Sequence, residues 1–290
     1  MFTSSFYTHY QEVYPNDLHL KNELWYFLNK FHGINKILDY IKKLGKKHIH
    51  ICDIGGGYGY DDLLLKRIAE DQGLDIKIDV DVIDPTSDFY NKVHHLTGSD
   101  IAKQNTIQYI EDSFVHMDLE AYDEKYDIVI CCEVIEHLRT SEQEVFFANF
   151  NRILKKWWFI VVTNPNGSSI FKGIYGIYTR LKKQNHIFEA EFNYRYSHIG
   201  IPTIFQVLGL FQRKWFQVQN MLPTTLLSSS RVSVANVLIN KVFKLFKYIN
   251  LFFTTDIVYT AIKIEEIDDK KRFNQKSIVL ENNTKVNIEY

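Results

Sequence analysis

Residues 48–61 read HIHICDIGGGYGYD, and they decide the fold. An alternating apolar run leads directly into four glycines, at positions 55, 56, 57 and 59. Glycine loses more conformational freedom on folding than any other residue, so this many in one turn indicate a ligand that approaches the backbone closely. A helical pattern, DDLLLKRIAEDQG, follows at residues 61–73. The stretch therefore predicts a strand, a glycine loop and a helix, as in nucleotide-binding α/β proteins.

Composition limits the class of protein. The 290 residues suffice for one large α/β domain, and an apolar content of 46% is typical of globular proteins. A net charge of −1 argues against a protein whose main role is to bind nucleic acid through its phosphates. Cys52, Cys131 and Cys132 lie in apolar runs without a CxxC pattern, so buried reduced thiols are expected. The N-terminus is too polar for a signal peptide, and no apolar run reaches the roughly 20 residues that span a bilayer, which predicts a cytoplasmic location.

Strand and helix patterns alternate from residue 48 to residue 165. This alternation predicts a parallel sheet, whose ligands bind beyond the carboxyl ends of the strands. We expect strands at 48–54, 76–84, 106–112, 126–134 and 157–165, and helices at 61–73, 87–98, 142–156 and 201–211. Two late strands, at 214–222 and 256–266, are expected to be antiparallel to each other.

The domain organisation follows from these patterns. We expect an N-terminal helical cap at 1–46, a main domain at 47–267 and a polar tail at 268–290. Within the main domain, a cap insertion at 168–198 and a helical insertion at 221–255 before the last strand are expected.

The spacing of the glycines limits which kind of nucleotide the loop can bind. A dinucleotide site needs GxGxxG, but three positions after Gly57 stands Tyr60. Asp53, Asp61 and Asp62 flank the loop and would repel a phosphate. The loop is therefore expected to hold a ligand with a positive or zwitterionic end.

Asp53, Gly55, Gly57 and Gly59 match the first motif of the class I S-adenosylmethionine-dependent methyltransferases, an acid followed by glycines at alternate positions. The chain resembles this family well over residues 48–167 and loosely over 195–265. The resemblance implies an α/β, Rossmann-like three-layer sandwich around a seven-stranded, mostly parallel sheet with an antiparallel last strand. It also implies that the loop, Gly56 included, holds S-adenosylmethionine, and that Asp53 meets its ammonium directly or through water.

The resemblance assigns further residues at the strand ends. Asp84 would bind the ribose hydroxyls and Asp112 the adenine amino group, although Glu111 is an alternative to Asp112. Ser113 and Phe114 would supply a backbone amide and a ring face, and Glu133 would line the site near the methionine moiety. Asp127 starts its strand and is expected to be structural. Residues 163–167, TNPNG, resemble a strand ending found in ubiquinone-biosynthesis O-methyltransferases and in polysaccharide or lipid-carrier methyltransferases.

Glu133, Glu136 and His137 form an ExxEH cluster that related small-molecule methyltransferases also contain. His137 is the expected base for an acceptor hydroxyl, because imidazole titrates nearest to neutral pH. RNA 3′-terminal 2′-O-methyltransferases use ExxEH with a later histidine to hold a divalent metal. His198 stands 61 residues after His137 and completes that alternative, with Glu133, Glu136, His137 and His198 as candidate ligands. No metal site is the main expectation, and His198 then has an acceptor-site role or is a buried core residue.

The sequence thus predicts an S-adenosylmethionine-dependent O-methyltransferase acting on a small-molecule, sugar or lipid-linked acceptor. Metal-dependent RNA methylation and a non-catalytic binding protein with the same fold remain as alternatives, and a nicotinamide-dependent dehydrogenase is a weaker one. The amphipathic segment 234–253 fits either a core helix with a lysine edge or peripheral membrane contact. Oligomeric state is not predicted.

Overall fold

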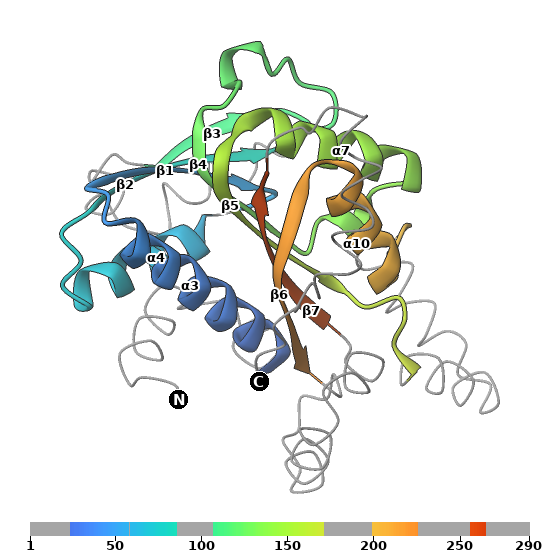
Figure 1. Ribbon diagram of the computed structural model, residues 1–290, viewed down its shortest axis with the longest axis horizontal. Coiled ribbons are helices and arrows are strands. Elements are labelled where there is room, and N and C mark those ends of the chain that lie inside the picture. Colours follow the sequence, from blue (N-terminus) through green and yellow to red (C-terminus); the bar gives the residue numbers. More distant parts are fainter. Residues whose placement is uncertain (1–23, 58, 86–106, 171–198, 226–255, 265–290) are drawn as a thin grey trace, which may run out of the picture.

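The computed structural model describes residues 24–57, 59–85, 107–170, 199–225 and 256–264 (Figure 1). The first half of the chain forms α3 (Leu24–Leu44), β1 (His48–Ile54), α4 (Tyr60–Asp71), β2 (Lys77–Asp84), β3 (Ile107–Glu111) and the 3-10 turn η1 (Glu120–Tyr122). The second half forms β4 (Tyr126–Cys132), the 3-10 turn η2 (Ile135–His137), α7 (Thr140–Ile153), β5 (Leu154–Pro165), α10 (Ile204–Arg213), β6 (Phe216–Thr225) and β7 (Asp256–Lys263).

All seven strands form one sheet in the order β3-β2-β1-β4-β5-β7-β6. The pairs β1–β2, β1–β4, β2–β3 and β4–β5 are parallel, whereas β7 runs antiparallel to both β5 and β6. This arrangement confirms the predicted fold class, including the antiparallel last strand. It also confirms that the two late strands pair with each other.

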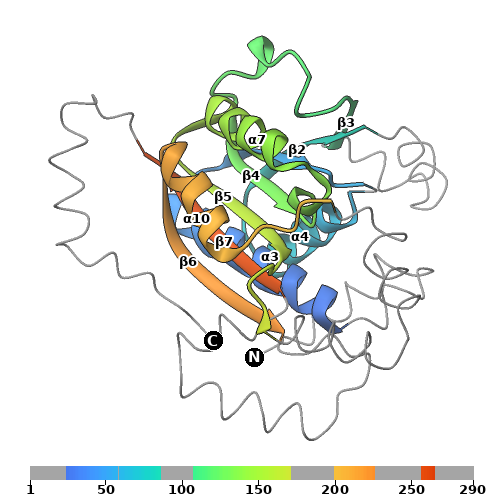
Figure 2. The same ribbon diagram turned by 90° about the vertical axis from the view of Figure 1, so that its right-hand side faces the viewer.

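Two layers of helices bury the sheet. α3 and α4 lie on one face, and α7 and α10 on the other (Figures 1 and 2). The core on the α7 side is rich in aromatic rings, and the Phe147 and Phe211 rings meet edge to face with centroids 4.9 Å apart. Burial on both faces explains the continuous apolar run of β4, in which every residue from Tyr126 to Cys131 is buried.

The boundary between α7 and β5 differs from the predicted one. The helix ends at Ile153, so residues 154–156, expected to be helical, begin the strand instead. Leu154 is fully buried and pairs with Tyr126 of β4, and its carbonyl accepts a hydrogen bond of 2.6 Å from Lys263 Nζ. Tertiary pairing therefore overrides the helical preference of Leu-Lys-Lys. β6 likewise continues to Thr225, into the range expected to start the helical insertion.

Several predicted features lie outside the described residues. These are residues 1–23 of the N-terminal cap, the helix at 87–98, most of the cap insertion at 168–198 with His198, most of the helical insertion at 221–255 with the segment 234–253, and the tail from 268. Cys52 and Cys131 are buried free thiols, as predicted, whereas Cys132 is only half-buried. No helix in the described ranges is long and apolar enough to cross a membrane.

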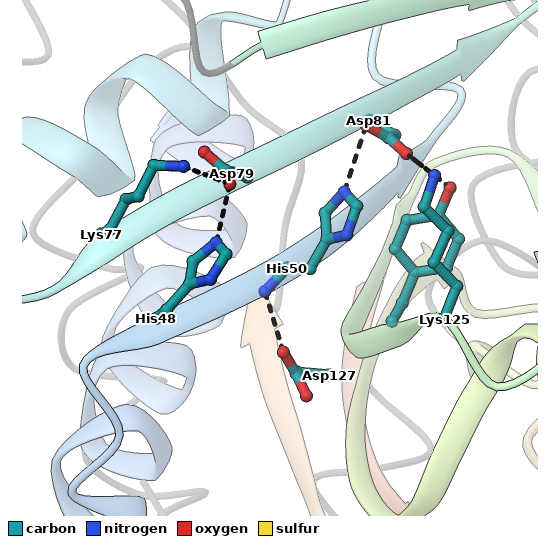
Figure 3. Close-up of polar contacts among 8 residues, drawn as sticks. His48, His50, Lys77, Asp79, Asp81, Lys125 and Asp127 are labelled. Atoms are coloured by element: carbon teal, nitrogen blue, oxygen red, sulfur yellow. Dashed lines mark hydrogen bonds and ion pairs between the residues drawn. The ribbon is translucent and has the colours of Figure 1, made fainter.

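A polar network joins the strands at the amino edge of the sheet (Figure 3). The nearly buried Asp81 of β2 accepts hydrogen bonds of 2.7 Å from both Lys125 Nζ and Tyr126 Oη, and its Oδ1 lies 3.2 Å from His50 Nε2. Asp127 accepts from the His50 backbone N–H at 2.9 Å and pairs with Lys155 at 2.8 Å. Asp127 thus ties β1 to β5, which agrees with the structural role expected for it. The network lies at the end of the sheet opposite the predicted site.

Candidate methyl-donor site

The predicted site residues gather at the carboxyl edge of the sheet. Asp53 precedes the last residue of β1, Asp84 ends β2, and Glu133 directly follows β4. The strand registers bring these ends level, since Ile54 pairs with Ile83 and Cys132 pairs with Thr163. Residues that are up to 110 positions apart in the sequence therefore share one edge, which is where ligands bind in sheets of this kind.

The glycine loop needs its glycines for two different reasons. Gly55, Gly57 and Gly59 have φ angles of 70°, 54° and 67°, in the left-handed region that favours glycine. A Cβ on Gly55 would overlap Val134, and one on Gly59 would lie 2.6 Å from the Tyr109 hydroxyl. A Cβ on Gly57 would meet no atom of the described residues within 4 Å. Gly55 and Gly59 thus allow close packing, whereas Gly57 opens onto free space at the strand ends.

Asp53 lies beneath this loop. Its side chain is only 2% exposed, and a Cβ on Gly56 would overlap its carboxylate. Burial, followed by the charge of Asp53, raises the pKa of the neighbouring Cys52 thiol well above its usual value. This position favours an indirect influence of Asp53 on a ligand ammonium, through the loop or through water, over direct contact.

Asp84 connects β2 to the glycine loop. Its Oδ2 accepts a hydrogen bond of 3.3 Å from the Gly57 N–H, and its side chain is half-buried. A carboxylate beside the open space at Gly57 can accept hydrogen bonds from a diol, as predicted for a ribose. The loop and the acid of the second strand therefore form one continuous surface.

The predicted adenine-side residues follow β3. Asp112 is exposed, and its Oδ1 accepts a hydrogen bond of 2.6 Å from the Ser113 N–H. Glu111, the alternative acid, is exposed and lies opposite Asp84 in the strand register. Phe114 is 4% exposed, and its ring packs against Phe146 with centroids 5.2 Å apart. The ring of Phe114 is thus part of the core.

The ExxEH cluster occupies the turn after β4. Glu133 has a φ of 57°, which is uncommon for a residue with a Cβ. Thr163 holds it at two points, because Thr163 Oγ1 donates to Glu133 Oε1 at 2.8 Å and its carbonyl accepts from the Glu133 N–H at 3.0 Å. Glu136 is 1% exposed, and its Oε1 lies 4.0 Å from Nε2 of the 37% exposed His137. The turn therefore presents an imidazole backed by a buried carboxyl group.

His198 lies outside the described residues. Gly200, which is described, donates its N–H to the Glu136 carbonyl at 3.0 Å. In the described ranges, no three His, Cys, Asp or Glu side chains are grouped so as to hold a metal ion.

Three further polar residues at this edge escaped the sequence analysis. Thr163 supports Glu133, Gln143 is buried beside η2, and Asp256 is 5% exposed at the start of β7. Asp256 reaches the edge because β7 is antiparallel and begins beside Pro165, where β5 ends. The predicted direction of the last strand was the signal that could have identified it. The TNPNG stretch marked the position of Thr163 but not its contact with Glu133, 30 residues away, and nothing in the sequence indicated that Gln143 would bond Gly200.

Comparison with known proteins agrees with this geometry. Residues 26–218 match the family model described as methyltransferase domain, so the chain belongs to that family, the class I S-adenosylmethionine-dependent methyltransferases. Magnesium protoporphyrin IX methyltransferase from Synechocystis PCC 6803, solved with bound S-adenosylhomocysteine, is a structural neighbour at a TM-score of 0.55 and 13% identity, over 90% of this chain and 96% of that one.

Two other solved structures share the fold. The YcgJ protein from Bacillus subtilis gives a TM-score of 0.53 at 13% identity, over 81% of this chain and 100% of its own. The StiE O-MT domain gives 0.52 at 14% identity, over 87% of this chain and 80% of that one. No functionally curated protein has a significantly similar sequence.

Proposed function

We propose that this protein transfers the methyl group of S-adenosylmethionine to a hydroxyl of a small-molecule, sugar or lipid-linked acceptor. One observation supports this most directly. The open space at Gly57, bordered by the Asp84 carboxylate, lies at the same sheet edge as the partly exposed imidazole of His137. The residues that we propose for the methyl donor and for the acceptor hydroxyl therefore follow adjacent strands, β1 and β4.

The residues of the loop fit S-adenosylmethionine. Gly55, Gly56 and Gly57 would let the ligand approach the backbone, and Asp84 would accept hydrogen bonds from the ribose hydroxyls. Asp112, whose Oδ1 accepts from the Ser113 N–H, would meet the adenine amino group. When bound, S-adenosylmethionine supplies an activated methyl group on a positively charged sulfur. The chain therefore has mainly to align the acceptor with that group.

His137 and Glu136 provide the chemistry on the acceptor side. His137 would accept the proton of the acceptor hydroxyl at its ring nitrogen as the new bond to carbon forms. The buried Glu136, 4.0 Å from Nε2, would orient the ring and stabilise its protonated form. Glu133, fixed by Thr163, would border the space between the two ligands.

The acceptor class rests on broader features. The net charge of −1 and the name of the StiE O-MT domain favour an O-methylated small molecule over a nucleic acid. Two apolar side chains, Ile170 after β5 and Ile199 before α10, are exposed. Exposed apolar side chains of this kind would suit contact with a ring or an acyl chain.

Calorimetry with S-adenosylmethionine, followed by transfer of its tritiated methyl group to a panel of phenols, free sugars and lipid-linked sugars, tests the proposal. His137→Ala should lower turnover by about 100-fold or more, the usual contribution of a general base, with little change in cofactor affinity. His116→Ala is the matched control, because His116 is an exposed histidine after β3 that the proposal leaves unused. Absence of cofactor binding by the wild-type protein would refute an enzymatic role, and equal losses of turnover and affinity in His137→Ala would assign His137 to structure instead.

A further inference from the structure

Gln143 lies in the first turn of α7, next to the ExxEH turn, and its side chain is only 3% exposed. Its amide nitrogen donates to three backbone carbonyls, at 3.1 Å to Ile135, 3.2 Å to Leu138 and 2.6 Å to Gly200. A side-chain amide has two N–H groups, so three acceptors use its whole donor capacity.

These carbonyls belong to two segments that are more than sixty residues apart. Ile135 and Leu138 bracket Glu136 and His137, whereas Gly200 belongs to the chain that leads into α10. The two segments also bond directly, through the Gly200 N–H and the Glu136 carbonyl at 3.0 Å. Gly200 must be a glycine, because a Cβ there would overlap the Leu138 carbonyl and lie 2.9 Å from Gln143 Nε2.

The segment before α10 has a second attachment, to the end of β5. The Gly167 N–H donates to the Pro202 carbonyl at 3.0 Å, and the Ile204 N–H donates to Ser168 Oγ at 3.2 Å. Residues 200–204 therefore cross the carboxyl edge of the sheet between β5 and η2. Gln143 bonds this crossing segment and the ExxEH turn with the same amide.

The geometry points to Gln143 as the positioning residue of the acceptor-side turn. By holding both ends of η2 against the crossing segment, Gln143 fixes the direction of Glu136 and His137 relative to the donor pocket. The importance of this direction for catalysis rests on the proposed methyl transfer. The chemistry requires an amide, because a carboxylate would face three carbonyl oxygens and an apolar side chain would remove the donor that these carbonyls share.

Gln143→Met tests this role, since it keeps the length and volume of the side chain and removes its donors. Asn151→Leu is the matched control. Asn151 lies on the same helix, and its amide donates to the Lys214 carbonyl at 2.7 Å, at the far end of α7 from η2. Both variants lose one side-chain amide that donates to a backbone carbonyl, buried in Gln143 and half-buried in Asn151, but only Gln143 bonds the turn.

Two readouts need neither cofactor nor acceptor. The first is the imidazole resonance of His137 in histidine-labelled protein, identified among the 11 histidines by its loss in His137→Gln. The second is hydrogen exchange of the Gly200 amide, which reports whether the bond to Glu136 opens. In Gln143→Met we expect a displaced His137 resonance and Gly200 exchange faster by about tenfold or more, with neither change in Asn151→Leu.

Cofactor affinity separates this inference from the proposed function. Gln143→Met should bind S-adenosylmethionine within about twofold of wild type, because Gln143 has no contact with the glycine loop. If the wild-type protein fails to bind S-adenosylmethionine, the proposed methyl transfer is refuted, but the His137 resonance and the Gly200 exchange still test the role of Gln143. An unmoved His137 resonance together with unchanged Gly200 exchange in Gln143→Met would overturn the positioning role.

If Gln143→Met does not fold, Gly200→Ala carries the same test, because its methyl group would push the crossing segment away from Leu138. Its control is Gly209→Ala, whose nearest neighbour is the flexible end of Arg213 at 2.9 Å. If neither Gln143→Met nor Gly200→Ala folds while both controls do, the contact is a folding element, and the positioning role is wrong.

Discussion

Replacing Gly57 with alanine tests whether the open space in the glycine loop is the cofactor site. Gly57 and Gly73 form a matched pair, with φ angles of 54° and 65°, and a Cβ on either would meet no described atom within 4 Å. In the free protein, each alanine should therefore introduce backbone strain without a clash with any described atom. We expect a loss of about 1 kcal/mol of stability in both variants, the usual cost of a left-handed residue that has a Cβ.

The two variants should differ in their response to S-adenosylmethionine. Gly73 ends α4 at the amino edge, whereas the Gly57 N–H bonds Asp84 beside the predicted ligand. A methyl group on Gly57 would occupy volume that the ligand needs, and a loss of about 1.4 kcal/mol of binding free energy already means tenfold weaker affinity. Gly57→Ala should therefore bind at least about tenfold more weakly than wild type, and Gly73→Ala should bind equally well.

Thermal unfolding and calorimetry together distinguish the two effects. Both variants should unfold at a Tm lower by about 3 °C, as expected for 1 kcal/mol in a chain of this size. Only the Gly57 variant should lose affinity. If Gly57→Ala binds the cofactor as tightly as Gly73→Ala does, the ligand does not fill the space at Gly57, and the assignment of this loop is wrong.

Two further predictions concern the polar contacts at opposite edges of the sheet. Burial alone would raise the pKa of Asp81, but hydrogen bonds from His50, Lys125 and Tyr126 outweigh it and lower the pKa to about 2. Because the pKa is lower in the folded protein, the ionised carboxylate stabilises the fold at pH values above its unfolded-state pKa and no longer does so below about pH 2. Asp81→Asn should therefore lower the free energy of unfolding by about 2 kcal/mol at pH 7. In urea titrations this difference from wild type should shrink between about pH 4 and pH 2, and a constant difference would contradict the assignment. At the other edge, Thr163→Val keeps the side-chain shape but removes the hydrogen-bond donor to Glu133, so it should destabilise the fold by about 1 kcal/mol. Thr163→Ser keeps the donor and should retain most of that stability. Equal losses of stability in the two variants would rule out the hydrogen bond as the cause.

The fold, and the position of the candidate donor-side residues at one edge of the sheet, were predictable because both depend on local sequence. The alternation of strands and helices gives the parallel sheet, and it places the last residues of β1, β2 and β4 at one edge. The glycines between β1 and α4 then identify the turn that a ligand approaches. Asp84 and Glu133 follow from the same geometry, since each stands at or just after the end of a strand.

Contacts between distant segments were not predictable. Gln143 looks like an ordinary polar residue in a helical pattern, and only the return of the chain at Gly200, 57 residues later, lets its amide join two separate segments. Gly200 likewise reads as a loop glycine, although its small size is required by the Leu138 carbonyl. The α7–β5 boundary was predicted wrongly for a related reason, since pairing of Leu154 with Tyr126 decides it.

Backbone strain by itself does not identify the active edge of this protein. In the part of the chain that the structure describes, four residues with a side chain have positive φ angles. Three of them lie near the amino edge: Glu124 and Trp215 just before β4 and β6, and Trp157 in the first part of β5. Trp157 is 58% exposed, so its conformation belongs to a surface irregularity of β5. Glu133 differs because it follows its strand, lies at the carboxyl edge and is held by both the side chain and the carbonyl of Thr163. A conformation that costs energy persists only where its surroundings enforce it, and here the enforcing contacts also orient a carboxylate at the carboxyl edge, beside the proposed cofactor loop. The combination of strain with a dedicated hydrogen-bond partner therefore distinguishes Glu133 from the other three, and it supports the proposal that the turn after β4 takes part in the chemistry.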